Sequence, residues 1–391
     1  MRIAHILLSL NPDYGGPATS APSLAAAQSM SGHDVTLVVP ATPGVENDIA
    51  TAILQCPPLA KVRITTVRFS VVEQLRTLLP MPSPDIGELV DFDFLHIHDL
   101  WQPFLMCAAS TAIRHRIPYA LSPRGTLNSW SLAQKNLKKR ISLLLFWRDL
   151  LKRAAFIHAL NDTEAREILR SSPNSNIVIL PNGALLTPLE EMPRPNTFRK
   201  KYTLSTERRF ILFLGRLHTN KGLDLLVDAF SQLSEAFPDV DLVIAGPDEG
   251  AEPAARRQVK ALNLGNRIFL VGPVYGADKV AAFVDASVFC LPSRGEAFSM
   301  AIVEAMASGV PVVISEQCNF PEAADANAAI VCPLKPTDIA HGISSLLEDE
   351  SLRIQVAAKG QDLVSTNYSW GSIGKRMVAS YFYFSTLSET L

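Results

Sequence analysis

Short apolar runs alternate along the chain with longer segments in which apolar residues recur at helical spacing. In the first half the runs cover residues 5–10, 35–39, 94–98, 119–121, 156–160 and 177–180. In the second half they cover residues 210–214, 242–245, 268–271, 287–291, 311–314 and 329–331. Nearly continuous apolar strands separated by helices are typical of parallel sheets that are covered on both faces. The pattern therefore predicts an α/β fold with two doubly wound parallel-sheet domains.

A proline-rich stretch separates the two sets of strands and predicts the domain boundary. Pro188, Pro193 and Pro195 lie in a segment without strand or helix periodicity, which indicates a linker near residues 183–198. We expect an N-terminal domain over residues 1–187 and a C-terminal domain over residues 188–370. At 391 residues and 48% hydrophobic composition, the chain can fill two cores.

Charge and cysteine content exclude several classes of protein. Lysine and arginine number 36 against 38 acidic residues, so no overall charge points to a nucleic-acid partner. The N-terminal apolar run is too short for a signal peptide, and no run reaches the roughly 18 to 20 apolar residues of a membrane span. The five cysteines show no C-x-x-C spacing, which predicts reduced core residues of a cytoplasmic protein; they are Cys56, Cys107, Cys290, Cys318 and Cys332.

The loop and helix over residues 293–309 carry the most informative chemistry. Ser299 is expected to cap a helix that runs to Ser308 and is terminated by Gly309. Glu304 is the single charge in an otherwise apolar helix, and Glu296 lies in the loop that leads into it. A salt bridge from Glu304 to a neighbouring arginine is one interpretation. The other is a pair of acceptor carboxylates beside a helix N-terminus, which suits a ligand rich in hydroxyls and phosphate, such as a nucleotide sugar.

A basic loop follows the expected strand at residues 210–214. Arg216 and Lys221 lie just before a helix that begins near Leu223. Cations at a helix N-terminus oppose the helix dipole, so their placement indicates an anion such as a diphosphate between them. A solvated basic loop is the alternative interpretation.

Other familiar site patterns are weak or absent. Gly15 and Gly16 follow the first strand and permit close approach of the backbone to a ligand, but the dinucleotide and P-loop patterns are missing. The strings Asp91-Phe92-Asp93 and Asp239-Val240-Asp241 resemble metal-binding pairs, yet each directly precedes a strand, where carboxylates are ordinary turn residues. Histidines and cysteines lack zinc spacing. We therefore predict no metal and no cofactor beyond a nucleotide-sugar co-substrate.

Together these motifs resemble glycosyltransferase family 4, the retaining group 1 glycosyl transferases of GT-B fold, and in particular its polysaccharide-assembly type. The resemblance covers most of the chain and rests on Glu296-x7-Glu304, the loop at residues 215–222 and Gly15-Gly16. Weaker matching segments lie in the same order along the chain, at residues 31–35, 96–99, 180–183, 245–247 and 368–370.

The resemblance implies two Rossmann-like domains facing a cleft, with the donor on the second domain and the acceptor on the first. It also implies that a helix at about residues 371–391 packs back on the first domain. Arg216 and Lys221 would hold the donor diphosphate, Glu296 the sugar hydroxyls and Glu304 the ribose. Further donor contacts would come from residues near the sugar, phosphate and base, namely Gly15, Gly16, Gly272, Pro273, Val274, Phe298 and Ser299. No protein nucleophile is required.

The sequence departs from the family after the expected strand at residues 119–121. The family usually has a histidine there, whereas this chain has Arg124. An always-charged guanidinium cannot act as a general base, so Arg124 is expected to bind charge on a substrate or phosphate. His98 is the alternative polar group near the reacting sugar. His158 also ends a strand and is more simply interpreted as a core histidine.

Candidate acceptor contacts lie in the first half of the chain. Trp101 and Trp130 follow expected strand ends and could stack on an acceptor sugar, although core packing explains them equally well. Residues 135–153 interleave basic with large apolar side chains, which fits peripheral contact with an anionic membrane surface or, equally, a core helix with a solvated basic face.

The sequence as a whole favours a retaining, metal-independent hexosyltransferase of cell-surface polysaccharide biosynthesis. The donor is a UDP- or GDP-linked sugar, and the acceptor is a saccharide or lipid-linked saccharide. Two alternatives remain open at this stage. One is a nucleotide-sugar epimerase or hydrolase of the same fold, and the other is a non-catalytic sugar-nucleotide sensor, which the arginine at position 124 keeps open.

Overall fold

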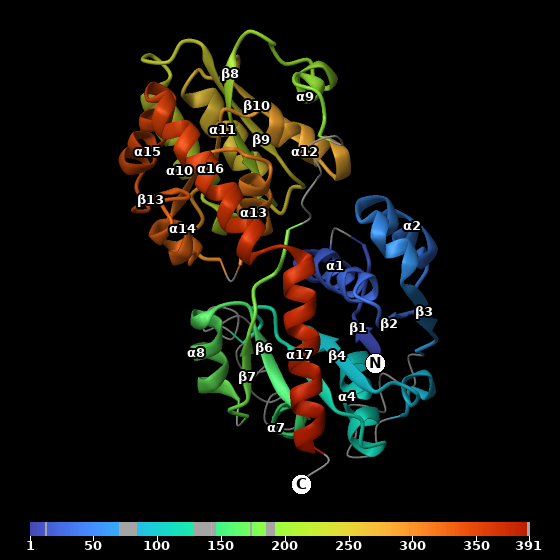
Figure 1. The fold of residues 1–391 in the computed structure, drawn as a ribbon. Coiled ribbons are helices and arrows are strands. Elements are labelled where there is room, and N and C mark those ends of the chain that lie inside the picture. Colours follow the sequence, from blue (N-terminus) through green and yellow to red (C-terminus); the bar gives the residue numbers. More distant parts are fainter. Residues whose placement is uncertain are drawn as a thin grey trace. The chain divides into compact units, whose positions relative to one another are not determined.

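The computed structural model divides the chain into two compact units (Figure 1). It describes residues 1–11, 14–69, 84–127, 142, 146–172, 174–184, 192–296 and 298–388, without the side chains of residues 387 and 388. Unit 1 comprises Met1–Gly183 and Trp370–Leu391, and unit 2 comprises Ala184–Ser369. The chain thus leaves unit 1 after Gly183 and returns to it at Trp370.

Unit 1 is built on a seven-stranded sheet with strand order β3-β2-β1-β4-β5-β6-β7, and all its strand pairs are parallel. The strands are β1 (Arg2–Ile6), β2 (Asp34–Pro40), β3 (Arg63–Val67), β4 (Phe94–His98), β5 (Tyr119–Ser122), β6 (Phe156–Ala159) and β7 (Ile177–Ile179). The helices are α1 (Gly16–Met30), α2 (Val45–Gln55), α4 (Pro103–Arg114), α7 (Arg148–Arg153), α8 (Asp162–Ser171) and α17 (Trp370–Ser388), with short 3-10 helices at Pro57–Lys61 and Gly87–Leu89.

Two details of unit 1 differ from the sequence pattern. The edge strand β3 has no apolar run because Arg63, Ile64, Thr65 and Thr66 remain partly or fully exposed, so hydrophobicity alone missed it. The first strand ends at Ile6 rather than at residue 10.

Unit 2 is built on a six-stranded parallel sheet with strand order β10-β9-β8-β11-β12-β13. The strands are β8 (Arg209–Leu214), β9 (Val240–Ala245), β10 (Ile268–Gly272), β11 (Val288–Leu291), β12 (Val312–Ser315) and β13 (Ile330–Cys332), which confirms all six predicted runs. The helices are α9 (Thr197–Lys201), α10 (Leu223–Leu233), α11 (Glu252–Ala261), α12 (Gly276–Asp285), α13 (Met300–Ala307), α14 (Pro321–Asp325), α15 (Pro336–Glu348) and α16 (Glu350–Asn367), with 3-10 helices at Thr219–Lys221 and Glu316–Cys318.

Both sheets are doubly wound. The order of strands reverses between β1 and β4 in unit 1 and between β8 and β11 in unit 2. Connections leave the two central strands in opposite directions at such a point, and ligands of open α/β sheets bind in the crevice at its carboxyl edge. Functional side chains are therefore expected in the loops that follow these four strands.

Each unit has its own hydrophobic core. All five cysteines are buried free thiols, as the absence of paired spacing predicted. In the part of the chain that the structure describes, no helix combines the length and the apolar character that crossing a membrane requires.

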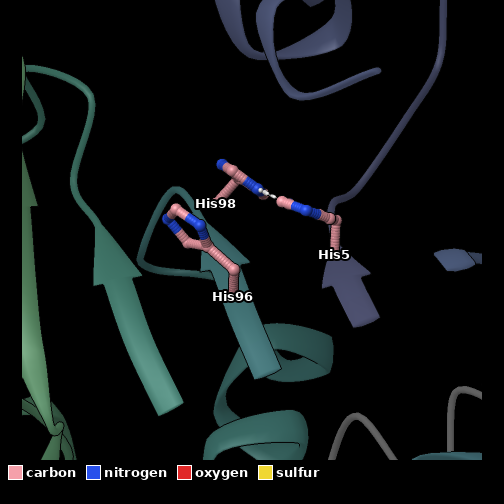
Figure 2. A group of neighbouring side chains, drawn as sticks. All are labelled: His5, His96 and His98. Carbon is pink, nitrogen blue, oxygen red and sulfur yellow. Dashed lines mark hydrogen bonds between the residues drawn. The ribbon is translucent and has the colours of Figure 1, made fainter. Parts of the chain in front are cut away.

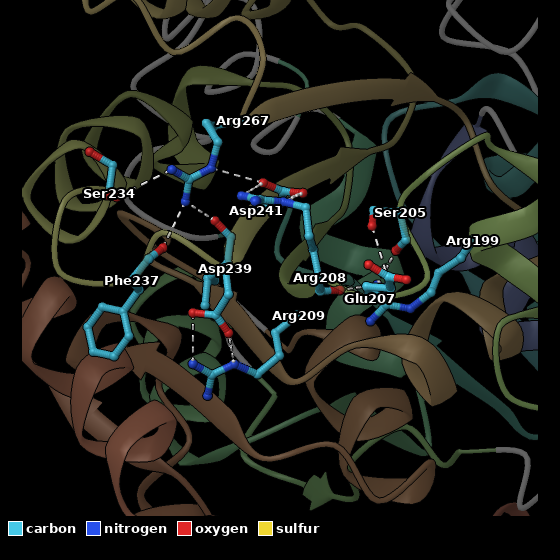
Figure 3. Close-up of polar contacts among 11 residues, drawn as sticks. Arg199, Ser205, Glu207, Arg208, Arg209, Ser234, Phe237, Asp239, Asp241 and Arg267 are labelled. Atoms are coloured by element: carbon cyan, nitrogen blue, oxygen red, sulfur yellow. Dashed lines mark hydrogen bonds and ion pairs between the residues drawn. The ribbon is translucent and has the colours of Figure 1, made fainter.

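A network of arginines and aspartates lies at the amino ends of β8 and β9 (Figure 3). Asp241 accepts hydrogen bonds from Arg208 Nε at 2.8 Å and from Arg267 Nε at 3.0 Å. Asp239 pairs with Arg209 at 2.7 Å. The second Asp-x-Asp string is therefore an arginine-paired structural element, with Asp241 inside β9 rather than before it. Asp93 of the first string likewise pairs with Arg2, at 2.8 Å.

Candidate functional site

In unit 2 a partly buried ion pair joins the loops that follow β8 and β11. Lys221 Nζ lies 2.6 Å from Glu296 Oε1, and their side chains are 17% and 8% exposed. Lys221 ends a 3-10 helix over Thr219–Lys221, and Glu296 lies three residues before the helix cap at Ser299. The pair thus lies at the switch point of the sheet, where a ligand is expected.

Backbone and side-chain hydrogen bonds tie these two loops together. Asn220 Nδ2 donates to the carbonyl of Gly295 at 2.5 Å, and the carbonyl of Asn220 accepts from Ser293 Oγ at 2.9 Å and from the backbone N–H of Arg294 at 2.7 Å. Arg294 also forms two hydrogen bonds to Asp224, the second residue of α10, at 2.9 and 2.7 Å. These contacts hold Lys221 and Glu296 in a fixed geometry, which is what a preorganised site needs.

Gly222 fits tightly between the same two loops. Its φ is +69°, in the left-handed region, and a Cβ added there would lie 1.9 Å from the carbonyl oxygen of Pro292. Gly215, at the start of the same loop, has nothing within 4 Å of an added Cβ. A side chain is thus excluded at one glycine of the loop and has room at the other.

Gly222→Ala is expected to destabilise unit 2 by about 2 to 4 kcal/mol, since it combines backbone strain with a clash against a carbonyl group. Gly215→Ala is the matched control and should unfold close to wild type. Thermal unfolding followed by far-ultraviolet circular dichroism measures both. Equal melting temperatures for the two variants would contradict the packing described here.

Arg216 corrects one part of the sequence argument. Its guanidinium Nη1 lies 2.7 Å from Glu249, and its side chain is half exposed. Because Lys221 also has a carboxylate partner, both cations are balanced by the protein itself. The premise that they are unfavourable unless an anion lies between them is therefore wrong, and their value as anion-binding groups rests on position rather than on unpaired charge.

Helix α13 is less buried than its sequence indicated. Ile302, Val303, Ala305 and Met306 are buried, whereas Glu304 is partly exposed and pairs with Lys279 of α12 at 2.7 Å. Glu304 thus has a salt-bridge partner, a lysine where the sequence suggested an arginine, while its carboxylate stays partly exposed. Ser299 occupies the cap position, but its side chain makes no capping hydrogen bond.

The remaining donor candidates lie at other loop ends of unit 2. Gly272 closes β10 with φ +80°, and its carbonyl accepts from the N–H of Gly246 at 2.8 Å. Pro273 after it is exposed, and Val274 is buried. Phe298 is partly buried against the core of unit 2, with its ring centroid 6.2 Å from that of Phe320.

In unit 1 the Gly15-Gly16 turn lies after β1 and opens helix α1. Gly15 has φ +95°, and neither glycine has anything within 4 Å of an added Cβ. Among the described residues, therefore, nothing fills the space beside the first turn of α1, and α1 begins without a side-chain cap on its N–H groups. An uncapped helix start with open space can accept an anionic ligand.

His98 and Arg124 meet at the carboxyl ends of β4 and β5. Arg124 Nη2 lies 3.0 Å from His98 Nδ1, and Arg124 Nη1 donates to Asn182 at 2.6 Å and to Ser20 of α1 at 3.0 Å. Burial lowers the pKa of Arg124 to about 10, so the guanidinium remains charged at neutral pH. All three hydrogen bonds go to neutral acceptors, and the carboxylates of Glu164 and Asp99 interact with the guanidinium charge through space.

Left-handed backbone conformations gather beside this pair. Asp99, Trp101 and Arg124 have φ values of 77°, 74° and 55°. Non-glycine residues in this region store strain, which is common at functional sites. Three such residues in two adjacent strand-end loops support a functional role for this edge of unit 1.

The acceptor candidates are only partly described. Trp101 is partly buried against the core of unit 1, with its ring centroid 6.4 Å from that of Trp147. Trp130 and most of residues 135–153 lie outside the described residues, and the part of that stretch that is described includes α7. His158 is buried and hydrogen-bonded on both ring nitrogens, which confirms that it is a core histidine.

Several residues in contact with these sites were not named as site residues from the sequence, although Asn182 lies in the matching segment at residues 180–183. Glu249 and Lys279 pair with Arg216 and Glu304, while Asn182 and Ser20 hold Arg124. Tyr381 of α17 contacts His96. The first four contacts join residues that are 25 to 104 positions apart. No local pattern could have paired them.

The fold and these sites define a class of protein with two doubly wound units, each carrying polar residues at a sheet switch point. Family models agree: "Glycosyl transferase 4-like domain" matches residues 15–183, and "Glycosyl transferases group 1" matches residues 195–362. The chain is 27% identical over 379 residues to phosphatidyl-myo-inositol mannosyltransferase of Mycolicibacterium smegmatis, covering 94% of this chain and 90% of that protein.

Solved structures show the same fold. Anabaena HepE in complex with UDP and glucose superposes with a TM-score of 0.77 at 18% identity, covering 97% of this chain and 99% of HepE. Sucrose-phosphate synthase from Thermosynechococcus elongatus gives a TM-score of 0.72 at 18% identity, covering 99% and 100%. The chain therefore belongs to glycosyltransferase family 4 and has the GT-B fold.

Proposed function

We propose that this protein is a retaining, metal-independent glycosyltransferase. It moves a hexose from a UDP- or GDP-linked sugar to a saccharide or lipid-linked saccharide acceptor in cell-surface polysaccharide biosynthesis. The observation that carries the proposal is the partly buried Lys221–Glu296 pair at the switch point of unit 2. The names of the relatives support it, since one acts on a phosphatidyl-inositol acceptor and HepE holds UDP and glucose.

In the proposed reaction, the bond between the anomeric carbon and the donor phosphate oxygen breaks, and the electron pair leaves with the nucleoside diphosphate. An acceptor hydroxyl bonds to the same face of the anomeric carbon, and an oxygen of the leaving phosphate takes its proton. Lys221, with Arg216, stabilises the charge that develops on the phosphate. Glu296 accepts hydrogen bonds from the sugar hydroxyls, and Glu304 from the ribose.

Further contacts follow from the loops described above. The base would lie beside Gly272, Pro273 and Val274, and the backbone of Phe298 and Ser299 would support the sugar or phosphate. Arg124 would bind charge on the unit 1 side, with Gly15 and Gly16 approaching the diphosphate. His98, the other polar group expected near the reacting sugar, is buried with both ring nitrogens hydrogen-bonded, so it would hold Arg124 rather than contact the sugar. Trp101 and Trp130 would stack on the acceptor, and residues 135–153 would contact the membrane that carries a lipid-linked acceptor.

The test measures donor binding and turnover together. Purified protein is heated with UDP, GDP and a panel of their sugars, and a ligand at about 100 times its dissociation constant should stabilise the fold by roughly 2.7 kcal/mol. Release of nucleoside diphosphate is then measured with saccharide acceptors, with EDTA added, and the product anomer is assigned by NMR.

We expect one donor to stabilise the protein selectively. Release of nucleoside diphosphate should depend on the acceptor and should persist in EDTA, and the product should keep the anomeric configuration of the donor. Loss of activity in EDTA or an inverted product would overturn the metal-independent, retaining mechanism. Donor consumption without acceptor would indicate an epimerase or hydrolase, and binding without turnover a sensor. Absence of stabilisation by every donor in a cooperatively folded sample would contradict the donor site.

A further inference from the structure

Four histidines are buried on one face of the unit 1 sheet. His5 comes from β1, His96 and His98 from β4, and His158 from β6. The parallel register pairs His5 with His96 across adjacent strands, and His98 with Ser122 of β5. Side chains two residues apart on one strand share a face, so the cluster forms along neighbouring strands toward their carboxyl ends. Figure 2 shows the hydrogen bond between His5 and His98, with His96 beside them on the same strand as His98.

Hydrogen bonds connect these histidines to Arg124 in a single line. The contacts, in order, are Arg124 Nη2 to His98 Nδ1 (3.0 Å), His98 Nε2 to His5 Nδ1 (2.9 Å), His5 Nε2 to Gln28 Oε1 (2.7 Å), Gln28 Nε2 to Tyr381 OH (3.3 Å), Tyr381 OH to His96 Nδ1 (2.5 Å), His96 Nε2 to Ser122 Oγ (2.6 Å), Ser122 Oγ to His158 Nδ1 (2.7 Å) and His158 Nε2 to the carbonyl of Leu180 (2.7 Å). Every ring nitrogen of the four histidines has one partner in this line.

The chemistry of the two ends fixes the direction of the line. A guanidinium can only donate, so His98 Nδ1 accepts and His98 Nε2 carries the proton. The same step repeated places the proton of His5 on Nε2, facing the amide oxygen of Gln28. At the other end a carbonyl can only accept, so His158 carries its proton on Nε2 and accepts from Ser122.

The two ends agree where they meet. Ser122 donates to His158, so it accepts from His96 Nε2, and His96 Nδ1 then accepts from the Tyr381 hydroxyl. Tyr381 in turn accepts from the Gln28 amide, which is the orientation that the His5 side demands. The donor and acceptor roles assigned from the two ends therefore do not conflict, because the Tyr381 hydroxyl can accept from Gln28 and donate to His96.

We infer that the four histidines are neutral and that each carries its proton on Nε2. Every hydrogen bond in the line then donates in the direction away from Arg124, and the line as a whole positions Arg124. Tyr381 of α17 is the positioning residue that joins the His98–His5 part of the line to the His96–His158 part. The tautomers stand on geometry alone, whereas the consequence for catalysis rests on the proposed function of Arg124. Cooperative polarisation along such a line strengthens each member, so Arg124 is held by more than its one contact with His98.

The same geometry argues against two other uses of the cluster. The potential ligand atoms of His5, His96 and His98 all lie within 4.8 Å of one another, which is a spacing that a metal could use. Each lone pair is already committed to a hydrogen bond, however, and Arg124 places a positive charge 3.0 Å from His98. A proton relay is also disfavoured, because neither a guanidinium nor a carbonyl at the ends exchanges protons near neutral pH.

Burial supports the neutral state. The pKa of His5 falls to about 4 and that of His158 to about 3, and those of His96 and His98 fall well below the ordinary range, in each case mainly through desolvation. The charged and titratable groups that face them are Arg124, Tyr381 and the other histidines of the cluster.

The first experiment determines the histidine tautomers in the wild-type protein. Protein labelled with 15N-histidine is examined by long-range 1H–15N correlation, and the eight histidines are assigned with single His→Gln variants. The four buried histidines should each show the Nε2–H pattern at neutral pH and should be unaffected by added Co²⁺ or Zn²⁺. An Nδ1–H or imidazolium pattern for any of the four, or a metal-induced change, would overturn the inference.

The second experiment cuts the line at its centre. Tyr381→Phe keeps the ring, which stacks on Phe94 at 4.3 Å, but removes the hydroxyl that Gln28 and His96 share. Tyr383→Phe, on the same helix and 61% exposed, is the matched control. Tyr381→Phe should shift the ring-nitrogen signals of His96, its direct partner. It should also shift those of His98, which is connected to Tyr381 only indirectly, by way of His5 and Gln28.

The activity readout is a split between kinetic constants. Tyr381→Phe is expected to lower kcat by about tenfold with little change in KM, because it loosens Arg124 rather than removing a contact with substrate. Tyr383→Phe should leave kcat at the wild-type value. Unchanged histidine signals in Tyr381→Phe would overturn the positioning role, whereas shifted signals in a protein without transferase activity would count only against the proposed function.

Discussion

Replacing Lys221 with methionine is expected to lower kcat by on the order of 10² to 10³-fold, the scale of losing one donor that stabilises charge in a transition state. The reason is its position. Lys221 ends the loop after β8, at the switch point of unit 2, and its side chain is only 17% exposed. In the proposed reaction this partly buried cation would meet the leaving phosphate in a surrounding of lower dielectric than water, where its effect is greater.

The Lys221→Met variant has a stability effect that must be separated from its effect on catalysis. Without the lysine, the Glu296 carboxylate, which is 8% exposed, is left without its partner, and such a loss typically destabilises by about 3 to 5 kcal/mol. The double variant Lys221→Met with Glu296→Gln removes that unpaired charge. It should recover most of the stability and none of the activity.

Lys260→Met is the matched control for the loss of a lysine. Lys260 is exposed on α11 of the same unit, and its replacement should leave kcat at the wild-type value. The measurement is nucleoside diphosphate release with saturating donor, alongside the melting temperature of each variant. Activity within a few-fold of wild type in Lys221→Met would remove Lys221 from the proposed mechanism.

Acidification from pH 7 to pH 5 is expected to destabilise unit 1 by several kcal/mol. The pKa of His5 is lowered to about 4 and that of His158 to about 3, with His96 and His98 also well below the ordinary value of about 6.5. The unfolded chain therefore binds more protons than the folded chain once the pH falls below about 6.5. Stability is fully present above that value and is lost as the pH falls toward the folded-state pKa values.

The expected size of the effect is large. A histidine that stays neutral in the folded state contributes roughly 2 kcal/mol of destabilisation at pH 5, so His5 and His158 contribute about 4 kcal/mol together. His96 and His98 act in the same direction. The loss is a large part of the stability of an ordinary domain, which is about 5 to 15 kcal/mol. Glu164 acts in the opposite direction, because burial raises its pKa and favours its protonation in the folded state.

Tryptophan fluorescence measures this transition in unit 1 alone, since all four tryptophans belong to that unit. Urea unfolding at pH 7.5, 6.0 and 5.0 should show a midpoint that falls steeply below pH 6.5. His158→Gln keeps one donor and one acceptor but does not titrate, so it should reduce the pH dependence by about one proton. A midpoint that stays constant between pH 7 and pH 5 would contradict neutral buried histidines.

Much of the fold was predictable because local pattern carries it. In unit 2, β8 to β13 coincide with apolar runs, and the left-handed Gly309 after α13 is visible as a glycine that follows an apolar helix. Strand β3 was not predictable in this way. As an edge strand it leaves four of its five residues partly or fully exposed, so its sequence lacks the apolar run of a central strand.

The residues of the candidate sites were likewise predictable in part. Gly15, Gly16, Lys221, Glu296 and Glu304 could be identified from the sequence because loop and helix signals surround them. Their partners could not be identified, because contacts such as Lys221–Glu296 and Arg124–Asn182 join residues 75 and 58 positions apart.

The sequence by itself determined the alternation of strands and helices, the two-domain α/β organisation and the residues that occupy the loops at each sheet edge. Hydrophobic periodicity and turn chemistry are local, so they can be read without the fold. Only the tertiary structure decided that Arg216 and Lys221 are balanced by Glu249 and Glu296, and that a tyrosine of the last helix closes a line of histidines behind Arg124. Such pairings depend on which strand ends become neighbours in the sheet, and the local sequence around a residue does not determine this.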